Sequence, residues 1–142
     1  MNLIKKFTID RPSLEIPWGI QEKAFLALMA NHPCKKITDG HYRARCKVFQ
    51  SLELDLDFHF KPRSSGRLFQ IEFYRKPSRH RKRAFDEIQA VLEKELGPGV
   101  REGASLDGPL PCKWSLGSIV VRHQYYYQFG MHEKVVFLNN SI

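Results

Sequence analysis

Cysteine is scarce in this chain of 142 residues, and its placement excludes the two common structural uses of the residue. Only Cys34, Cys46 and Cys112 are present. Their number is odd and no CxxC pair occurs, so the pattern matches neither a disulfide framework nor a cysteine zinc site. Three free thiols are typical of a reducing compartment.

Long apolar runs are missing as well. No stretch approaches the roughly 18 consecutive apolar residues that a membrane-spanning helix requires. The N-terminal segment contains neither a long apolar region nor a small-residue cleavage site, so we read no signal peptide in it. The sequence therefore predicts a cytoplasmic protein that has no contact with a membrane.

The sequence also lacks the signatures of the common enzyme classes. It has no G-x-S-x-G nucleophile turn, no phosphate-binding P-loop, no HExxH helix and no glycine-rich dinucleotide turn. Its six histidines are scattered along the chain. We therefore predict a protein that is not an enzyme, with no catalytic residue, no metal site and no cofactor.

The composition is that of an ordinary globular domain. Hydrophobic residues make up 42% of the chain and charged residues 27%, which is close to average usage. Ten Phe, five Tyr and two Trp supply ample material for a core. The length suits one core, so we predict a single domain over residues 1–142.

The clearest local signal is the strict alternation of apolar and polar residues over 41–60. A period of two predicts two strands, each with one buried and one exposed face. A turn at Gln50 pairs residues whose numbers sum to 100. In that register, apolar residues pair with one another on one face, and oppositely charged residues pair on the other face. Both sets of cross-strand pairs favour this register. It predicts burial of Tyr42, Ala44, Cys46, Leu54, Leu56 and Phe58, and exposure of Arg43, Arg45, Asp55 and Asp57.

Two helices and further strands complete the expected fold. Apolar stripes at helical spacing predict helices over about 21–31 and from about 79 or 84 to 96. Strands are expected at 3–9, 68–74, 113–116, 118–129 and 135–138. The order β-α-β-β-β-α-β-β-β predicts an α+β fold with a largely antiparallel sheet and two packed helices, in which one helix followed by three strands occurs twice. The residues expected to pack inward are Phe25, Leu28, Phe85, Ile88 and Leu92 from the helices, and Phe69, Ile71 and Phe73 from 68–74.

Polar residues on the exposed face of the hairpin are the first candidates for a site. Asp55, Asp57 and His59 share a face by their spacing, and Glu72 on the next strand approaches Asp57. Two carboxylates and an imidazole are groups that bind a metal or move a proton, which is the pattern of a hydrolase. Cross-strand ion pairing explains the same residues without chemistry, and we favour it. The candidates for binding on this sheet face are Arg43, Arg45, Asp55, Asp57, His59 and Glu72.

A short basic segment carries most of the net charge of +8. Residues 75–83 contain six Lys and Arg and no acid, while the rest of the chain is nearly balanced. If Ser78 caps the second helix, cations occupy the positive end of its dipole, which favours an anionic partner. If the helix starts near Ala84, the segment is a basic loop. Both alternatives suit a phosphate or an acidic protein surface, and a solubilising role remains open. The candidate residues are Arg75, Lys76, Arg79, His80, Arg81, Lys82 and Arg83.

Several short motifs together resemble a loose pattern found in small bacterial domains. In that pattern a Trp-Gly helix precedes three strands, and a second helix ending in Leu-Gly precedes a strand group that contains Trp. The likeness covers most of the chain. The motifs that carry it are Ile16-Pro17-Trp18-Gly19-Ile20, Asp39-Gly40-x-Tyr42, Leu54-x-Leu56-x-Phe58-x-Phe60, Ser65-Gly66-x-Leu68, Leu96-Gly97 and Trp114-Ser115-Leu116-Gly117.

This resemblance implies a role like that of immunity proteins to secreted toxins, or of other accessory binding proteins, and it carries over no catalytic residue. Many immunity proteins are acidic, whereas the isoelectric point here is about 9.6, so the partner would be an acidic toxin or the role would differ. We therefore predict a non-enzymatic protein-binding module of bacterial immunity type. The alternative is a nucleic-acid or phosphate binder that uses residues 75–83. The oligomeric state stays open.

Overall fold

The computed structural model describes residues 3–61, 66–75, 81–103, 110–127 and 131–141. Within these ranges the chain forms two helices and ten strands. The N-terminal elements are β1 (Lys6–Ile9), β2 (Leu14–Pro17), α1 (Glu22–Leu28), β3 (Lys35–Thr38), β4 (His41–Val48), β5 (Leu52–Phe60) and β6 (Leu68–Tyr74). The C-terminal elements are α2 (Arg81–Leu96), β7 (Val100–Arg101), β8 (Cys112–Leu116), β9 (Ile119–Tyr127) and β10 (Met131–Asn139).

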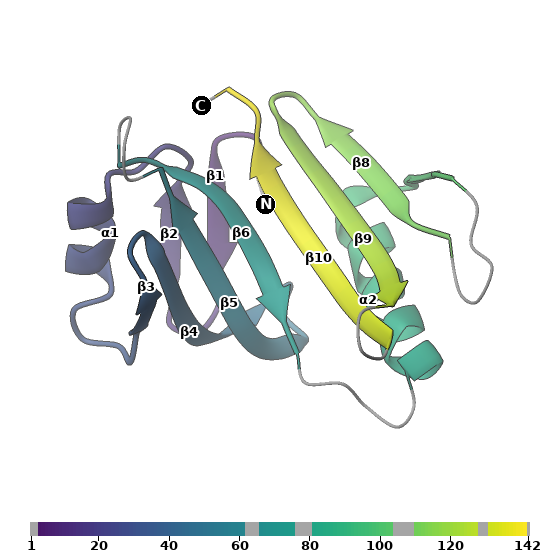
Figure 1. The fold of residues 1–142 in the computed structure, drawn as a ribbon, viewed down its shortest axis with the longest axis horizontal. Coiled ribbons are helices and arrows are strands. Elements are labelled where there is room, and N and C mark those ends of the chain that lie inside the picture. Colours follow the sequence, from purple (N-terminus) through teal and green to yellow (C-terminus); the bar gives the residue numbers. More distant parts are fainter. Residues whose placement is uncertain (1–2, 62–65, 76–80, 104–109, 128–130, 142) are drawn as a thin grey trace.

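Eight of the strands form one antiparallel sheet in the order β3-β4-β5-β6-β10-β9-β8-β7 (Figure 1). This confirms the predicted α+β fold with a large antiparallel sheet. Each helix is followed by four strands rather than three, since β3 and β7 are additional short edge strands. Within each group of four, the first strand lies at an edge of the sheet and the last lies at its centre. The two groups are joined where β6 pairs with β10. The remaining strands, β1 and β2, form a separate hairpin.

The hairpin of β4 and β5 has the register that the alternation predicts. His41 pairs with His59, and Val48 pairs with Leu52 at the turn. Phe49 and Gln50 adopt positive φ angles of 51° and 65°, which non-glycine residues rarely do. The carboxylate of Asp10 accepts a hydrogen bond of 2.7 Å from the backbone N–H of Gln50 and so stabilises this turn.

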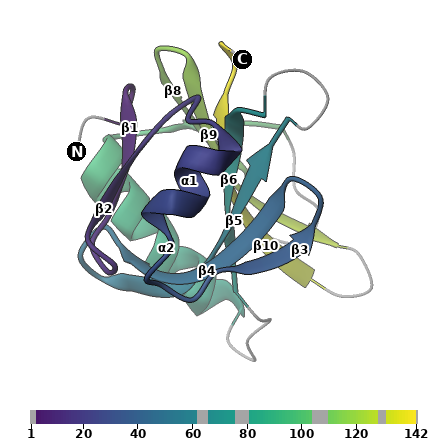
Figure 2. The ribbon, with the colours of Figure 1, turned by 90° about the vertical axis from the view of Figure 1, so that its left-hand side faces the viewer.

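One face of the sheet, which we call the covered face, packs against both helices and the β1–β2 hairpin (Figure 2). Cross-strand pairing places the side chains of Phe58, Ile71 and Phe137 in one row on this face. Phe25 of α1 lies 4.8 Å from the ring centroid of Phe58, and Phe7 of β1 lies 5.2 Å from that of Phe137. All five side chains are fully buried, so the core lies between this face and the elements that cover it.

The helix packing follows the prediction with one exception. The side chains of Phe85, Ile88 and Leu92 on α2 are buried as expected. Leu28 is 39% exposed, so its predicted place in the core is wrong. Because α1 has only seven residues, the inward contacts of this segment come from Phe25 and from Met29 at its C-cap. Neither described helix is long and apolar enough to cross a membrane.

A β-bulge corrects a second expectation, on β6. The register between β5 and β6 shifts at His59 and Phe60, so Phe60 pairs with Leu68 rather than with Phe69. Leu68 therefore takes the buried position, and Phe69 is only partly buried. Its ring lies 6.4 Å from that of His59, on the opposite face from the core. An extra residue in one strand turns the following side chains to the other face, which alternation alone does not reveal.

Candidate functional site

The opposite face of the sheet, the open face, brings polar side chains of β4, β5 and β6 together. Figure 1 is viewed from this side, with the strands in front of the helix α2. Odd-numbered residues on β4 pair with odd-numbered residues on β5. The odd-numbered side chains of both strands therefore lie on this face. Asp57 also pairs with Glu72 on β6. We call the set His41, Arg43, Asp57, His59 and Glu72 the open-face group.

Arg43 holds Asp57 with two hydrogen bonds. Its Nε donates to Oδ1 at 2.6 Å and its terminal nitrogen donates to Oδ2 at 2.9 Å. The ring of Tyr74 lies 4.0 Å from the guanidinium carbon and stacks on it. With Arg43 and His41 against it, Asp57 is only 5% exposed, so its predicted exposure is wrong. Arg43 itself is half-buried.

The charge of this carboxylate is maintained by its neighbours. Burial by itself raises the pKa of Asp57, but the hydrogen bonds from Arg43 and the nearby charges of Arg43 and His41 outweigh that effect. The pKa of Asp57 therefore lies below its ordinary value, and the group is a carboxylate at physiological pH. A buried anion that remains charged attracts cations and hydrogen-bond donors.

His41 and His59 stack face to face beside this carboxylate. Their ring centroids are 4.2 Å apart and the ring planes differ by 27°. The Nε2 atom of His41 lies 3.1 Å from Oδ2 of Asp57, and that of His59 lies 3.5 Å from Oε1 of Glu72. Neither contact has the direction of a hydrogen bond, so both buried Nε2 atoms are without a partner among the described residues.

The pKa of His59 lies below its ordinary value. Burial is the main cause, and the negative charge of Glu72 opposes it only in part, while the neighbouring His41 adds to the lowering. The imidazole of His59 is therefore neutral near pH 7, with a ring nitrogen that can act as a ligand. Two imidazoles and a carboxylate whose ligand atoms lie within 4.8 Å of one another can bind a cation.

The other predicted residues of this face lie apart from the open-face group. Arg45 approaches Asp55 at 3.9 Å and donates to the backbone oxygen of Glu53 at 3.1 Å. Arg45 is exposed, as predicted, while Asp55 is half-buried rather than largely exposed. The prediction that Glu72 approaches Asp57 is confirmed. Sequence reasoning missed His41, although the predicted register already placed it opposite His59.

Comparison with known proteins gives no match for this chain. No family model, curated protein or solved structure matches the chain. The resemblance of the short motifs to immunity proteins therefore stays a prediction.

The basic segment is described only in part. Lys76, Arg79 and His80 lie outside the described residues. Arg75 donates to the backbone oxygen of Ala84 at 2.9 Å and to Glu133 at 3.2 Å, so it holds the start of α2 against β10.

Of the two predicted starts of the second helix, the later one near Ala84 is wrong, while the predicted cap Ser78 lies outside the described residues. Helix α2 begins at Arg81, and its first turn contains no acidic residue. Lys82 and Arg83 are exposed and lie in an open hollow with Asp86 and Glu87, one turn further along.

A second polar group, the covered-face group, lies under α2 and consists of Arg75, Gln89, His123 and Glu133. His123 on β9 is fully buried, and its ring stacks on Phe85 at 3.8 Å between centroids. Its Nδ1 contacts Oε1 of Gln89 at 2.7 Å, and its Nε2 contacts a carboxylate oxygen of Glu133. Burial lowers the pKa of His123 more than Glu133 raises it. Both ring nitrogens have partners, so this group attaches α2 to the sheet.

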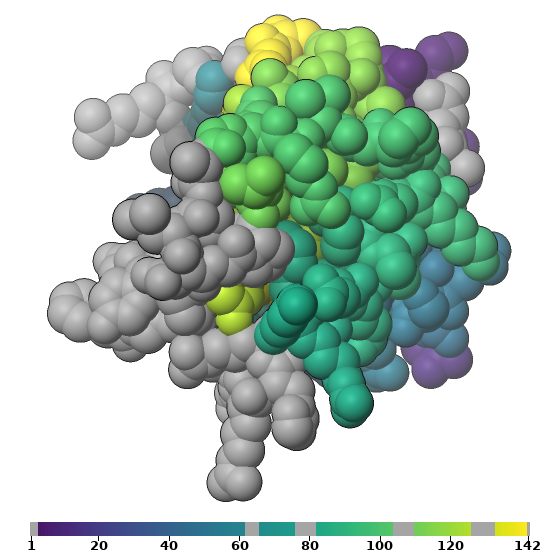
Figure 3. All heavy atoms as spheres, turned by 90° about the vertical axis from the view of Figure 1, so that its right-hand side faces the viewer, coloured from purple at the N-terminus to yellow at the C-terminus, as the bar shows by residue number. Residues whose placement is uncertain are grey.

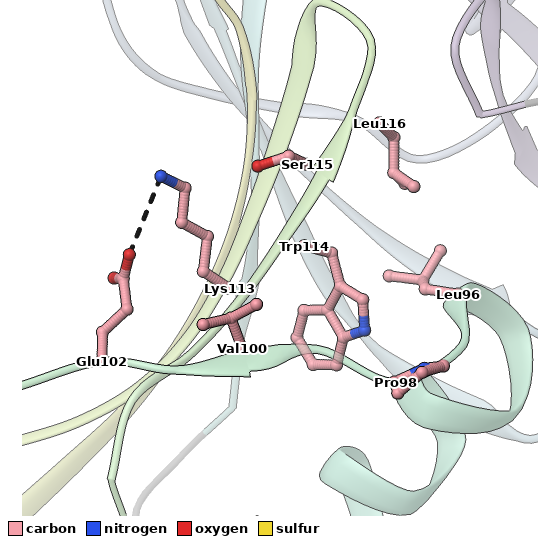
Figure 4. Close-up of a pocket in the computed structure, with 8 residues that line it drawn as sticks. All are labelled: Leu96, Pro98, Val100, Glu102, Lys113, Trp114, Ser115 and Leu116. Atoms are coloured by element: carbon pink, nitrogen blue, oxygen red, sulfur yellow. Dashed lines mark ion pairs between the residues drawn. The ribbon is translucent and has the colours of Figure 1, made fainter.

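A cavity of about 410 Å³ opens on the side of the molecule formed by the end of α2 with β7 and β8 (Figure 3). The indole of Trp114 points toward Leu96 and Pro98, while Lys113 reaches Glu102 at 3.7 Å (Figure 4). The indole N–H donates to the backbone oxygen of Gly97 at 2.8 Å. The cavity therefore has an apolar wall and one ion pair at its rim.

Close packing beneath this cavity explains a glycine. A Cβ atom at Gly99 would lie 2.4 Å from Sγ of Cys112 and 2.8 Å from the ring of Trp114. Such distances are far below van der Waals contact, so the chain needs glycine at this position for the backbone to approach the indole.

Proposed function

We propose that this chain is a non-enzymatic binding module that holds a protein partner on the open face of its sheet. The observation that carries the proposal is the division of the sheet: both helices and the β1–β2 hairpin pack on the covered face, while charged side chains of both signs from β4, β5 and β6 occupy the open face. Strands of a central sheet hold such side chains in fixed positions, which favours recognition of one partner.

The composition of this face supports a protein as the partner. Tyr74 is 40% exposed and stacks on Arg43, and exposed Arg45 lies two residues further along β4. Tyr and Arg are enriched among the residues that dominate binding energy at protein interfaces. A net charge of +8 favours an acidic partner, so a toxin bound by this chain would be an acidic one. The cysteines are unpaired, which supports the cytoplasm as the location.

Site-specific photocrosslinking in the cells that produce the protein tests this proposal. A photoreactive phenylalanine analogue replaces Tyr74 on the open face or, as a control, Lys23, which is exposed on α1. We expect one crosslinked protein from position 74 and none from position 23. Arg45→Glu should then weaken binding of the purified partner at least about tenfold, while Lys23→Glu should leave it unchanged. Equal crosslinking at both positions would reject the open face as the binding surface.

The absence of hydrolytic activity remains a prediction about the same face. Purified protein should not turn over nitrophenyl esters or phosphate esters, with or without added Zn²⁺, Mn²⁺ or Mg²⁺. Metal-dependent turnover that Asp57→Asn abolishes, in a variant that stays folded, would show that the open-face group is catalytic instead.

Anion binding by the basic segment is a second candidate function, and one observation favours it. Helix α2 begins at Arg81 with cations in its first turn, where the helix dipole already favours an anion. A gel-shift experiment at about 150 mM salt measures binding to generic DNA and RNA. If the segment binds phosphates, combining Arg79→Ala, Arg81→Ala and Arg83→Ala should flatten the salt dependence by up to about three phosphate equivalents. Absence of sub-micromolar binding would reject this candidate.

A further inference from the structure

We infer that His41, Asp57 and His59 form a binding site for a divalent transition-metal ion, with Zn²⁺ as the best-matched ion, on the open face of the sheet. The inference goes beyond the proposed binding of a protein and does not depend on it. One ligand atom from each of the three residues lies within 4.8 Å of the others. Imidazole with carboxylate is a donor set that suits zinc and its neighbours in the first transition row.

The backbone fixes the relative positions of the three residues. His41 and His59 are directly paired across β4 and β5, and Asp57 precedes His59 by two residues on the same face. Zinc bonds of about 2.0–2.2 Å in a tetrahedral site place ligand atoms roughly 3.3 Å apart. The 3.1 Å between Nε2 of His41 and Oδ2 of Asp57 already matches this spacing.

The two ring nitrogens provide an independent indication of a ligand. Nε2 of His41 and Nε2 of His59 are buried and have no hydrogen-bond partner among the described residues. Buried polar atoms in folded proteins are nearly always paired, so each exception requires a reason. A cation between the rings and the carboxylate would satisfy both nitrogens at once.

The surroundings of the three ligands suit a bound cation. Arg43 orients Asp57 through two hydrogen bonds, and a carboxylate oxygen has a further lone pair with which to bind a metal. Outer hydrogen bonds of this kind are common at metal sites and fix the orientation of the ligand. The carboxylate of Glu72 lies 3.5 Å from His59 and 3.8 Å from the ammonium of Lys134, so its charge is balanced by Lys134 as that of Asp57 is by Arg43.

Titration of the purified, untagged protein with Zn²⁺ by calorimetry tests the inference. We expect one ion per chain with a dissociation constant that is roughly micromolar or tighter. His41→Gln and His59→Gln should each weaken binding at least about tenfold, since each removes a ligand. His32→Gln is the matched control: His32 is a described, partly buried histidine outside the site, and its replacement should leave the affinity unchanged.

Nuclear magnetic resonance of the histidine rings separates this site from the other histidines and does not require a variant to fold. On addition of Zn²⁺, the ring signals of His41 and His59 should shift, while those of His123 should not. Absence of stoichiometric Zn²⁺ binding overturns the inference. Binding that persists in the folded His41→Gln/His59→Gln double variant also overturns it, because the ion then binds elsewhere. Both measurements use the isolated chain, so their result is independent of whether a protein partner binds the open face.

Discussion

The open-face group and the covered-face group contain the same kinds of residue but differ in how completely they are paired. Each combines histidine, arginine and a carboxylate. Under α2, both ring nitrogens of His123 have partners and the ring of Phe85 covers them. On the open face, the buried Nε2 atoms of His41 and His59 have no hydrogen-bond partner among the residues that the structure describes. The residue types alone therefore do not separate a structural group from a ligand site, whereas the partners of each ring nitrogen do.

The largest expected difference concerns the aromatic neighbours of the two groups. Phe85, which is 1% exposed, stacks on His123, and Tyr74, which is 40% exposed, stacks on Arg43. Phe85→Ala should reduce the free energy of unfolding by about 3–5 kcal/mol because it leaves a cavity in the core. Tyr74→Ala should reduce it by less than about 1 kcal/mol because the side chain is exposed at the surface and its removal leaves no cavity in the core. Urea titrations of both variants measure this difference, and equal losses would contradict it.

Replacing His123 should also destabilise the protein more than replacing His59, but by a smaller margin than for the two aromatic residues. His123→Gln should cost about 1–3 kcal/mol, because it disrupts two buried contacts and leaves their partners unsatisfied. His59→Gln should cost less than about 1 kcal/mol, because the buried Nε2 of His59 has no hydrogen-bond partner to lose in the described part of the chain. Both values come from chemical unfolding in metal-free buffer. If His59→Gln proved the more destabilising change, the open-face group would be the structural one.

The smallest effect is a pH dependence of stability. The pKa values of His123 and His59 are lowered in the folded protein, mainly by burial. Below the unfolded value of about 6.5, these two histidines bind more protons in the unfolded chain than in the folded protein. Their contribution to the free energy of unfolding therefore falls as the pH decreases from about 6.5 toward the folded pKa values, and it does not change with pH above about 6.5. The loss is at most about 1.4 kcal/mol per pH unit for each histidine.

Unfolding midpoints at pH 5 and pH 7.5 measure this dependence. His123→Gln and His59→Gln should each reduce the difference between the two midpoints. Asp57 contributes only in more acidic solution, because its lowered pKa makes protonation costly below about pH 4. A wild-type protein that is more stable at pH 5 than at pH 7.5 would contradict the direction expected for both histidines.

The sequence predicted the β4–β5 register because two independent rows of side chains, one apolar and one charged, agreed on it. The same pattern could not predict the burial of Asp57, because alternation assigns a face but not the depth to which neighbours cover a residue. Short strands were missed for a related reason. Four-residue β2 follows Pro12 closely and ends at Pro17, so no strand was predicted there, and β3 and β7 are largely exposed edge strands without alternation.

Most of the covered-face group could not be predicted from local patterns. Gln89 lies 34 residues from His123 in the sequence, and only the packing of α2 on β9 brings them together. The proposed metal site could be predicted only in part. Asp57 and His59 were identified by their spacing, and His41 follows from the register. The sequence pattern could not show that the Nε2 atoms of His41 and His59 have no hydrogen-bond partner among the described residues, because this depends on the positions of the side chains.

The position of β10 in the sheet bears on how the chain folds while a ribosome produces it. This strand is the last of the sheet to be synthesised, yet it lies in the middle, joined by nine residue pairs to β9 and by four to β6. Until Met131–Asn139 has emerged, β6 and β9 each present an unpaired edge, and such edges promote aggregation. The two halves of the sheet therefore become one only after nearly all of this sequence has been translated, when the β9–β10 hairpin pairs with β6.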